Sequence, residues 1–307
     1  MRRSDEPTDE IGDAEVLASE STPAIHFDRV LNTYEGVTDL ATGLALAEVT
    51  FDDEPSYQTG EALPPLFTAG LTIDSYFECH SNNIDPGAIT EQIGGAHAES
   101  DVYFHAPIHA GQKVNWNCSI SGVSMNPAGT LTTIKMVVSD EHGGPLVTHL
   151  WTSIAIQGTT EFVGGEPLPD HRFPAEARVH KIGSETFLIP SDHGEAYFQA
   201  AGDPAPHSRF LEKALAEGHP GLILQGMCSF GIASGVAVRL GGDGDSRRLR
   251  RLAVRFSSPV LLGNELTVEV FKMATKPDGT REVAFEARQG DTICLSHGRA
   301  EFAPASP

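Results

Sequence analysis

The sequence predicts an α+β fold that is built twice in one chain, each unit being an antiparallel sheet wrapped around a long buried helix. Three observations predict this fold: an internal repeat, a set of strand-like segments after each copy of the repeat, and a helix-like apolar stretch before each copy. The chain has 307 residues, of which 40% are hydrophobic. That length allows one large domain or two of ordinary size, with a packed core.

The repeat consists of two ten-residue segments that share the pattern V-x-F-x-x-P-[IV]-x-x-G. They are VYFHAPIHAG, from Val102 to Gly111, and VRFSSPVLLG, from Val254 to Gly263, and they are offset by 152 residues. After each copy, three segments alternate apolar and polar residues and are joined by turns such as DEHGG and KPDGT. We therefore expect each half to end in an antiparallel meander of three strands.

The stretch upstream of each meander is typical of a helix. These stretches are PPLFTAGLTIDSYFECH in the first half and PGLILQGMCSFGIASGVAVRL in the second, and the second is apolar on every face, as a buried helix would be. The chain then divides into four predicted parts, which are an acidic mobile tail (1–24), an N-terminal unit (25–158), a linker rich in Pro, Gly and charge (159–180) and a C-terminal unit (181–307).

The composition excludes several classes of function. The chain has 42 acidic and 21 basic residues, so its formal charge of −21 would repel nucleic acid. No segment approaches the ~18 to 20 apolar residues of a membrane-spanning helix, and the N-terminus does not resemble a signal peptide, so we expect a cytoplasmic protein without a membrane partner. The cysteines are far apart and form no CxxC pair, which predicts reduced core residues rather than a disulfide or a zinc site. They are Cys79, Cys118, Cys228 and Cys294.

The most informative stretch is YFQAAGDPAPHSRFLEKALAEGHPGLILQGMCSFGIASG, which begins at Tyr197. It resembles the R-specific enoyl-CoA hydratases, also called hydratase 2 or MaoC-like dehydratases. That family carries F-x-x-L-S-G-D-x-N-P-[IL]-H-x-D, a helix, and then P-[IL]-[IL]-H-G-[LM]. Without a gap, Gly202, Asp203 and Pro206 fall on the G, D and P of the pattern, and LILQGMC falls on the second motif. The resemblance implies a double hotdog fold, with two tandem hotdog repeats of sheet around helix.

The resemblance also implies a hydro-lyase of fatty acid metabolism. Such an enzyme adds water to a 2-enoyl thioester or removes it from a 3-hydroxyacyl thioester, carried on coenzyme A or a carrier protein, with no other cofactor and no metal. In the family an Asp and a His share one water, while backbone amides at the buried helix N-terminus face the thioester oxygen. Asp203 matches the aspartate, although it could instead cap a helix near Ser208. Gly226 matches the glycine whose backbone amide faces the thioester oxygen in the family. Alternatively, this glycine is needed only for close packing.

The histidine of the pattern is where this sequence departs from the family. Ser208 occupies the place of the histidine, Ala205 occupies that of the asparagine, and His207 comes one position early. Either the turn rearranges to bring His207 to the water, or the ordinary pair is absent. Ser208 cannot replace the histidine as a base, because its hydroxyl stays protonated near neutrality.

Further candidates surround this motif. Gln225 stands where the family pattern has a histidine before its glycine. Ser234 occupies a position where some members of the family carry a serine, or it is simply a small residue at a contact between helices. The segment RLGGDGDSRRLRRLAVR could bind the phosphates of coenzyme A, with Arg251 and Arg255 on one strand face, or could be a solvated loop and strand.

The first half lacks the motif, so the resemblance implies that it shapes specificity. We interpret its histidines as surface or cleft residues rather than metal ligands, because their spacing does not converge on one ion. They are His97, His105 and His109. A non-hydrating hotdog protein that binds acyl thioesters or partners an active subunit is an open alternative. An acyl-CoA thioesterase is another, although the helix at 221–240 has no Asp or Glu. The protein could be a monomer or a homodimer.

Overall fold

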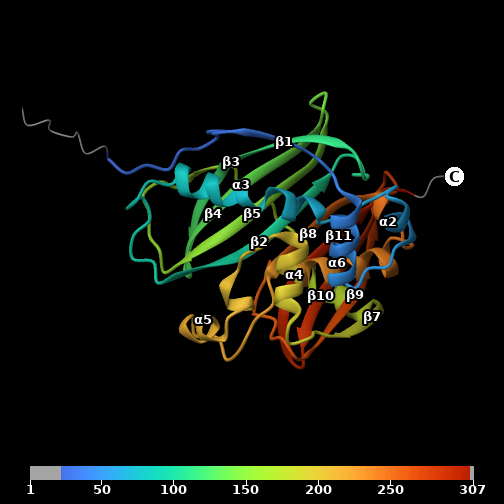
Figure 1. The fold of residues 1–307 in the computed structure, drawn as a ribbon. Helices are drawn as coiled ribbons and strands as arrows, with labels where there is room; N and C mark the ends of the chain where they lie inside the picture. The colour runs from blue at the N-terminus through green and yellow to red at the C-terminus, as the bar shows by residue number, and fades with distance from the viewer. Residues whose placement is uncertain (1–21, 305–307) are drawn as a thin grey trace, which may run out of the picture.

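The computed structural model describes residues 22–304 and confirms the double hotdog fold (Figure 1). Almost all of the predicted tail, 1–24, lies outside the described residues. The strands form one eleven-stranded sheet in the order β1-β3-β4-β5-β2-β8-β11-β10-β9-β7, with β6 paired to β3. Each half therefore contributes five equivalent strands, and the two sets meet at β2 and β8 with opposite order.

The N-terminal half contains the first predicted helix and meander. Its strands are β1 (Thr33–Val37), β2 (Gly94–Phe104), β3 (Lys113–Asn126), β4 (Gly129–Asp140), β5 (Pro145–Ile156) and the short β6 (Gly164–Gly165). Its helices are α1 (Leu40–Val49), α2 (Pro55–Thr59) and α3 (Phe67–Asn83). The sequence analysis missed β1, which is an outer strand that alternates half-buried and exposed residues.

The C-terminal half repeats this arrangement. Its strands are β7 (Lys181–Leu188), β8 (Leu249–Phe256), β9 (Glu265–Thr275), β10 (Arg281–Gln289) and β11 (Thr292–Phe302). Its helices are α4 (His193–Ala201), α5 (Leu211–Ala216) and α6 (Gly226–Gly241), with 3₁₀ turns η1 (Ala175–Val179), η2 (Pro206–Ser208) and η3 (Ser246–Arg248). The outer strand β7 was also missed.

The junction between the halves is the antiparallel pair formed by β2 and β8. In this pair Asp101 lies opposite Ala253, and the two positions are separated by the same 152 residues as the repeat. Equivalent positions of the two copies thus face each other, so a local two-fold axis passes through the middle of the sheet. Sheet hydrogen bonding continues across the junction and makes the two halves one body.

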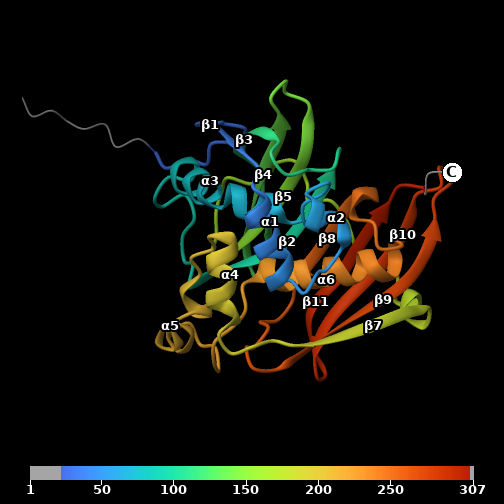
Figure 2. The ribbon, with the colours of Figure 1, turned by 45° about the vertical axis from the view of Figure 1, so that its right-hand side comes forward.

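Helix α6 is the buried helix that the sequence predicts, and Figure 2 shows it lying across the sheet of the C-terminal half. Every residue from Met227 to Val238 is buried. The helix begins at Gly226 rather than at the predicted Pro220, because the chain before it is extended: the Leu224 amide donates to the Val260 carbonyl at 2.8 Å. This strand-like approach aims the first turn of α6 at the junction between the halves.

The remaining predictions about the chain concern the linker, the cysteines and the membrane. Phe173 and Ala177, within the predicted linker, are buried against Phe271 and Ala284, so this segment packs on the C-terminal half. All four cysteines are free and buried. Within residues 22–304, no helix has both the length and the apolar character needed to cross a membrane.

Candidate active site at the start of helix α6

The first turn of α6 is the point where the motif segment and the N-terminal half meet. Like every helix, α6 leaves its first amides without partners in the helix, and these amides carry partial positive charge. A Cβ on Gly226 would lie 3.1 Å from Cε1 of Phe256 and 3.5 Å from Nδ1 of His97. A residue without a side chain is therefore well suited to this position, because Phe256 and His97 pack closely against it.

Asp203 lies beside this turn. It follows the end of α4, and its Oδ1 accepts a hydrogen bond from the Ala205 amide at 3.1 Å. Burial raises the pKa of this carboxyl above its ordinary value. Burial, and then the charge of Asp203, raise the pKa of the Cys228 thiol in the first turn of α6. Asp203 does not cap η2, whose N-cap is Ala205. The carboxylate therefore holds the turn that follows α4.

His207 turns toward α5. Its Nδ1 is 2.8 Å from Oε2 of Glu217, and its ring lies edge-on to that of His219, with the ring centres 5.9 Å apart. No hydrogen bond joins His207 to Asp203 among the described residues. The structure therefore places the aspartate and the histidine of the motif with different partners.

Ser208, at the motif's histidine position, turns inward. It is 1% exposed, and a Cβ on Gly194 would come within 2.1 Å of its carbonyl oxygen, so η2 packs directly on the start of α4. Gln225 reaches the same place, because its Nε2 donates to the Gly194 carbonyl at 2.9 Å. The Ser208 hydroxyl and the Gln225 Oε1 are buried without a partner in the part of the chain that the structure describes. The structure thus brings Ser208 and Gln225 together.

Ser234 lies two turns further along α6, where its hydroxyl donates to the Gly231 carbonyl at 2.8 Å. It lines a small cavity of about 300 Å³ together with residues of both halves. Those residues include Thr50, Asp52 and Phe67 from the N-terminal half and Tyr197 and Met227 from the C-terminal half.

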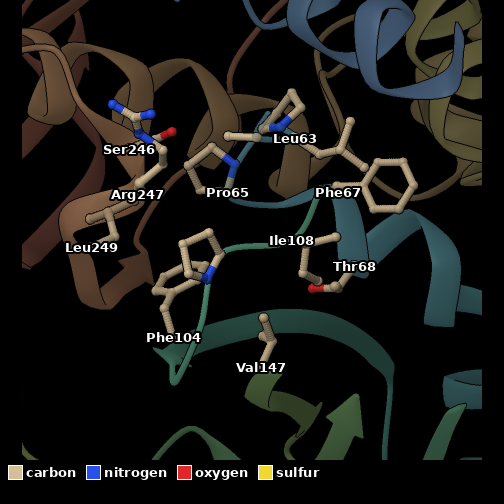
Figure 3. A pocket seen from close by; sticks show the side chains of 13 residues that line it. Leu63, Pro65, Phe67, Thr68, Phe104, Ile108, Val147, Ser246, Arg247 and Leu249 are labelled. Atoms are coloured by element: carbon tan, nitrogen blue, oxygen red, sulfur yellow. The ribbon is translucent and has the colours of Figure 1, made fainter. Parts of the chain in front are cut away.

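A second cavity, of about 400 Å³, adjoins the first and shares Pro64, Pro65 and Phe67 with it. Its wall is mostly apolar and comes largely from the N-terminal half, as Figure 3 shows. The labelled side chains of that half include Leu63, Phe104, Ile108 and Val147, and those of the C-terminal half are Ser246, Arg247 and Leu249. Together the two cavities form an apolar hollow between the halves.

The arginine-rich segment is used mainly within the protein. Arg251 donates two hydrogen bonds to Asp101 and Arg255 pairs with Glu99 at 2.7 Å, so both join β8 to β2. Arg251 is therefore buried and occupied, which corrects its assignment to coenzyme A phosphate. Arg255 keeps 42% of its side chain exposed, but its nearest group is the Glu99 carboxylate. Arg247 is the member of the segment that lines the larger cavity.

A polar cluster in the N-terminal half escaped the sequence analysis. His97 lies between the rings of Trp151 and Phe256, with centroid distances of 4.2 Å to each, so it is a half-buried residue rather than a surface one. Its Nε2 is 3.0 Å from the Ser100 hydroxyl, which is 2.9 Å from Nε2 of His149. Burial lowers the pKa of His97 well below its ordinary value and that of His149 to about 3, so both rings are neutral at pH 7.

Two further histidines that the sequence analysis named, His105 and His109, are exposed. Nε2 of His105 lies 3.1 Å from the Thr148 hydroxyl, and His109 contacts the Ala110 carbonyl. Residues 22–304 contain no group of three or more His, Cys, Asp or Glu side chains that could hold a metal ion.

Asp52 is a second residue that the sequence analysis missed. It is 6% exposed, lines the smaller cavity, and would lie 2.9 Å from a Cβ on Gly235 of α6. Burial raises its pKa to about 6, against the opposing charge of Arg239, whose Nη1 is 3.3 Å from its Oδ1. Nothing in the sequence around Asp52 signals this contact, because Arg239 is 187 residues away.

Known proteins are similar to this chain in sequence and in fold. A family model described as "MaoC like domain" matches residues 195–292. The chain carries a MaoC-like domain. A probable dehydratase of Ajellomyces capsulatus is 26% identical over 207 residues, which are 63% of this chain and 54% of that protein. The 3-hydroxyacyl-thioester dehydratase Y of Mycobacterium tuberculosis is 25% identical over 86% of this chain and 89% of its own length.

The fold of the whole chain is also shared. The crystal structure of a MaoC-like dehydratase from Phytophthora capsici aligns with a TM-score of 0.74, at 18% identity, over 90% of this chain and 96% of that one. The MaoC-like domain contains Asp203, Gly226 and Ser234, whereas His97 and Asp52 lie outside it. The chain spans about half the length of the first relative named and most of the second and third.

Proposed function

We propose that this chain is a hydro-lyase that hydrates 2-enoyl thioesters or dehydrates 3-hydroxyacyl thioesters, with Asp203 as an acid–base group. The observation that carries the proposal is the position of the Asp203 carboxyl, which is half-buried in the segment that matches the MaoC-like model and lies close enough to α6 for its charge to raise the pKa of the Cys228 thiol, together with burial. The similarity to a 3-hydroxyacyl-thioester dehydratase over most of both chains supports the substrate class.

The start of α6 suits the charge that develops in this reaction. Water addition and removal both pass through a form in which the thioester oxygen carries negative charge. Backbone amides at a buried helix N-terminus stabilise such an oxygen, because they are fixed in place and need no reorganisation. Gly226 allows Phe256 and His97 to pack closely against this turn, because a side chain at this position would contact both of them.

Two small cavities lie between the halves. Their walls are mostly apolar, with Asp52 at the smaller one, and come mostly from the N-terminal half, which lacks the motif. We assign that half to substrate selection. Arg247 lines the larger cavity, but its guanidinium donates two hydrogen bonds to Asp245, so we assign no phosphate contact to it. The proposal is for a cytoplasmic enzyme without other cofactors, as a monomer or a homodimer.

The test is spectroscopic. Purified protein should bleach the conjugated absorbance of enoyl-CoA substrates in a panel from four carbons to long chains. Asp203→Asn should lower kcat by at least ~100-fold, since a positioned acid–base group contributes that much or more. Asp192→Asn is the matched control, because Asp192 precedes α4 and makes no side-chain cap there. A wild-type protein that leaves the whole panel unchanged would overturn the proposal.

A non-hydrating acyl-thioester-binding protein is the second candidate. The observation that favours it is the inward Ser208 at the motif's histidine position, with His207 held by Glu217. This candidate expects acyl-CoA binding without turnover, measured by calorimetry alongside the absorbance assay. Release of free thiol from acyl-CoA in the same samples would instead identify a thioesterase.

A further inference from the structure

We infer that His97, from the N-terminal half, is the second proton carrier of this site and takes the role that the motif turn leaves unfilled. The inference rests on the proposed hydro-lyase function and names a further catalytic residue for it. It assigns chemistry to the half of the chain that lies outside the MaoC-like domain. Four observations carry it: the position of the ring, its fixed orientation, its tautomer and its protonation state.

The position comes from the junction of the two halves. His97 is on β2, whose neighbour β8 ends at Phe256, and both side chains lie against Gly226. A Cβ on Gly226 would be 3.5 Å from Nδ1 of His97. The ring nitrogen therefore lies beside the same helix turn whose amide would bind the thioester oxygen. C2 of the substrate, the atom that gains or loses a proton, is bonded directly to that carbonyl.

The orientation of the ring is fixed by stacking. The imidazole is nearly parallel to Trp151, at 10°, and is tilted by 35° to Phe256, at 4.2 Å from each. These contacts fix the plane of the ring. The contacts of Nε2 with the Glu99 carbonyl and the Ser100 hydroxyl keep the ring from rotating within that plane. A base that is held in place before the substrate binds loses little entropy in the reaction.

The tautomer follows from the partners of the other nitrogen. Nε2 lies 3.2 Å from the Glu99 carbonyl, and a carbonyl only accepts, so Nε2 carries the proton. Nδ1 is then the nitrogen with the free lone pair, and it faces Gly226. The Ser100 hydroxyl can donate to Nε2 of His149, which completes a chain of hydrogen bonds behind the ring.

The protonation states complement those of Asp203. Burial and the neighbouring His149 lower the pKa of His97, which favours the neutral imidazole. Burial raises the pKa of Asp203, which favours the carboxylic acid. The shift of His97 favours a neutral base and the shift of Asp203 favours a neutral acid. Removal of water requires these two forms.

The reaction balances with these two groups. In dehydration, the C2–H bond of the 3-hydroxyacyl thioester breaks and its proton goes to Nδ1 of His97. The electron pair moves onto the thioester oxygen, beside the Gly226 amide, and then forms the C2=C3 bond as the C3–O bond breaks. The departing oxygen takes the proton of Asp203 and leaves as water. His97 then loses its proton to solvent and Asp203 regains one, so hydration is the reverse sequence.

Two substitutions remove the nitrogen while preserving packing. His97→Gln keeps a donor for the Glu99 carbonyl, and His97→Phe keeps the stack between Trp151 and Phe256. The matched control is His105→Gln, which changes an exposed histidine on the following segment. Thermal unfolding of each variant shows which of them keep the fold.

Two assays separate this inference from the proposed function. The first is hydration of enoyl-CoA. The second is exchange of the C2 hydrogens of butanoyl-CoA in D₂O, followed by NMR, which needs a base near C2 but no leaving group. We expect both His97 variants to slow both reactions by at least ~100-fold. Asp203→Asn should stop hydration and keep exchange within a few-fold of wild type, and His105→Gln should change neither.

Each outcome decides one of the two statements. A folded His97 variant that hydrates and exchanges like the wild type overturns the role of His97 and leaves the hydro-lyase standing. Exchange that depends on His97, in a protein that hydrates no enoyl-CoA, supports the base and overturns the proposed function. A wild-type protein that does neither overturns both. Loss of exchange in Asp203→Asn, with exchange kept in His97→Gln, would reverse the two assignments.

Discussion

Arg251 and Asp101 join the two halves of the protein by two parallel hydrogen bonds. Nε to Oδ1 measures 2.9 Å and Nη2 to Oδ2 measures 2.7 Å. The two side chains are 12% and 6% exposed, so the pair is largely shielded from solvent. A bidentate arginine–carboxylate pair is specific in geometry as well as strong. It is therefore the charged contact most able to fix the register of β2 on β8.

Arg251→Ala should lower the free energy of unfolding by about 3–5 kcal/mol, because it leaves the Asp101 carboxylate buried without its partner. Arg255→Ala is the matched control on the same strand. Its ion pair with Glu99 is 42% exposed on the arginine side, so its loss should cost about 1 kcal/mol or less. Urea unfolding measures both. Equal losses in the two variants would contradict the distinct role of Arg251.

Asp52→Asn should stabilise the protein at pH 7.5 and not at pH 4. Burial raises the pKa of Asp52 from 3.8 to about 6. The positive charge of Arg239 lowers this pKa, and the negative charge of Glu54 raises it further. The folded protein therefore binds this proton more tightly than the unfolded chain, and its stability falls as pH rises from about 4 to 6. The full difference is about 3 kcal/mol, so we expect a gain of about 1–3 kcal/mol at pH 7.5.

Urea unfolding of wild type and Asp52→Asn across this pH range measures the difference. The two curves of stability against pH should converge near pH 4. A variant that is equally destabilised at both pH values would mean that the contact with Arg239 outweighs the cost of the buried charge.

His149→Gln should make the protein less sensitive to acid. Burial lowers the pKa of His149 from 6.5 to about 3, so this histidine stays neutral in the fold and takes up a proton on unfolding. Its contribution to stability is complete above about pH 6.5 and is lost as pH falls toward 3, the opposite sign to Asp52. Between pH 7 and 4.5 the wild type should lose about 2–3 kcal/mol more than the variant.

The glutamine amide can still accept the Ser100 hydroxyl, so the comparison isolates the titration. His97 faces the same cluster and titrates in the same direction, so some acid sensitivity should remain. Parallel curves for wild type and His149→Gln would show that folding does not shift the pKa of His149.

His207→Ala should change kcat by less than about three-fold. The Nδ1 of His207 is engaged by Glu217 and no hydrogen bond ties the ring to Asp203 among the described residues. The matched change is His219→Ala, at the histidine that packs on the same ring. A loss of ~100-fold in His207→Ala alone would restore the motif pair, with the turn rearranging when the substrate binds.

The sequence was sufficient to predict the parts of the fold that rest on local pattern. The two meanders and the buried helix follow from alternation, turn residues and apolar density, and the 152-residue repeat implies their duplication. The strands β1 and β7 lack that signal, because they lie at the two ends of the sheet with one neighbour each in the strand order. The start of α6 was misplaced because the chain before it pairs with a distant loop.

The site was predictable only where the motif itself fixes it. Asp203 and Gly226 both lie in the segment that matches the family model, as the pattern implies. The orientation of His207 depends on Glu217, ten residues later. The segment around His97, GGAHAES, reads as polar surface, and its burial comes from Trp151 and Phe256 on other strands. Contacts of this kind depend on tertiary structure and have no local signature.

The local two-fold axis at the junction distinguishes this chain from a dimer of two identical single units. In a symmetric pair of single units, the residue on the axis faces its own copy, so Asp101 would confront a second aspartate across the strands. In this chain the equivalent position is Ala253, and the carboxylate is free to bind Arg251. Because the two repeats belong to one chain, equivalent positions can carry different residues. The same freedom allows the two halves to carry different residues, with the motif aspartate Asp203 in one half and His97 in the other.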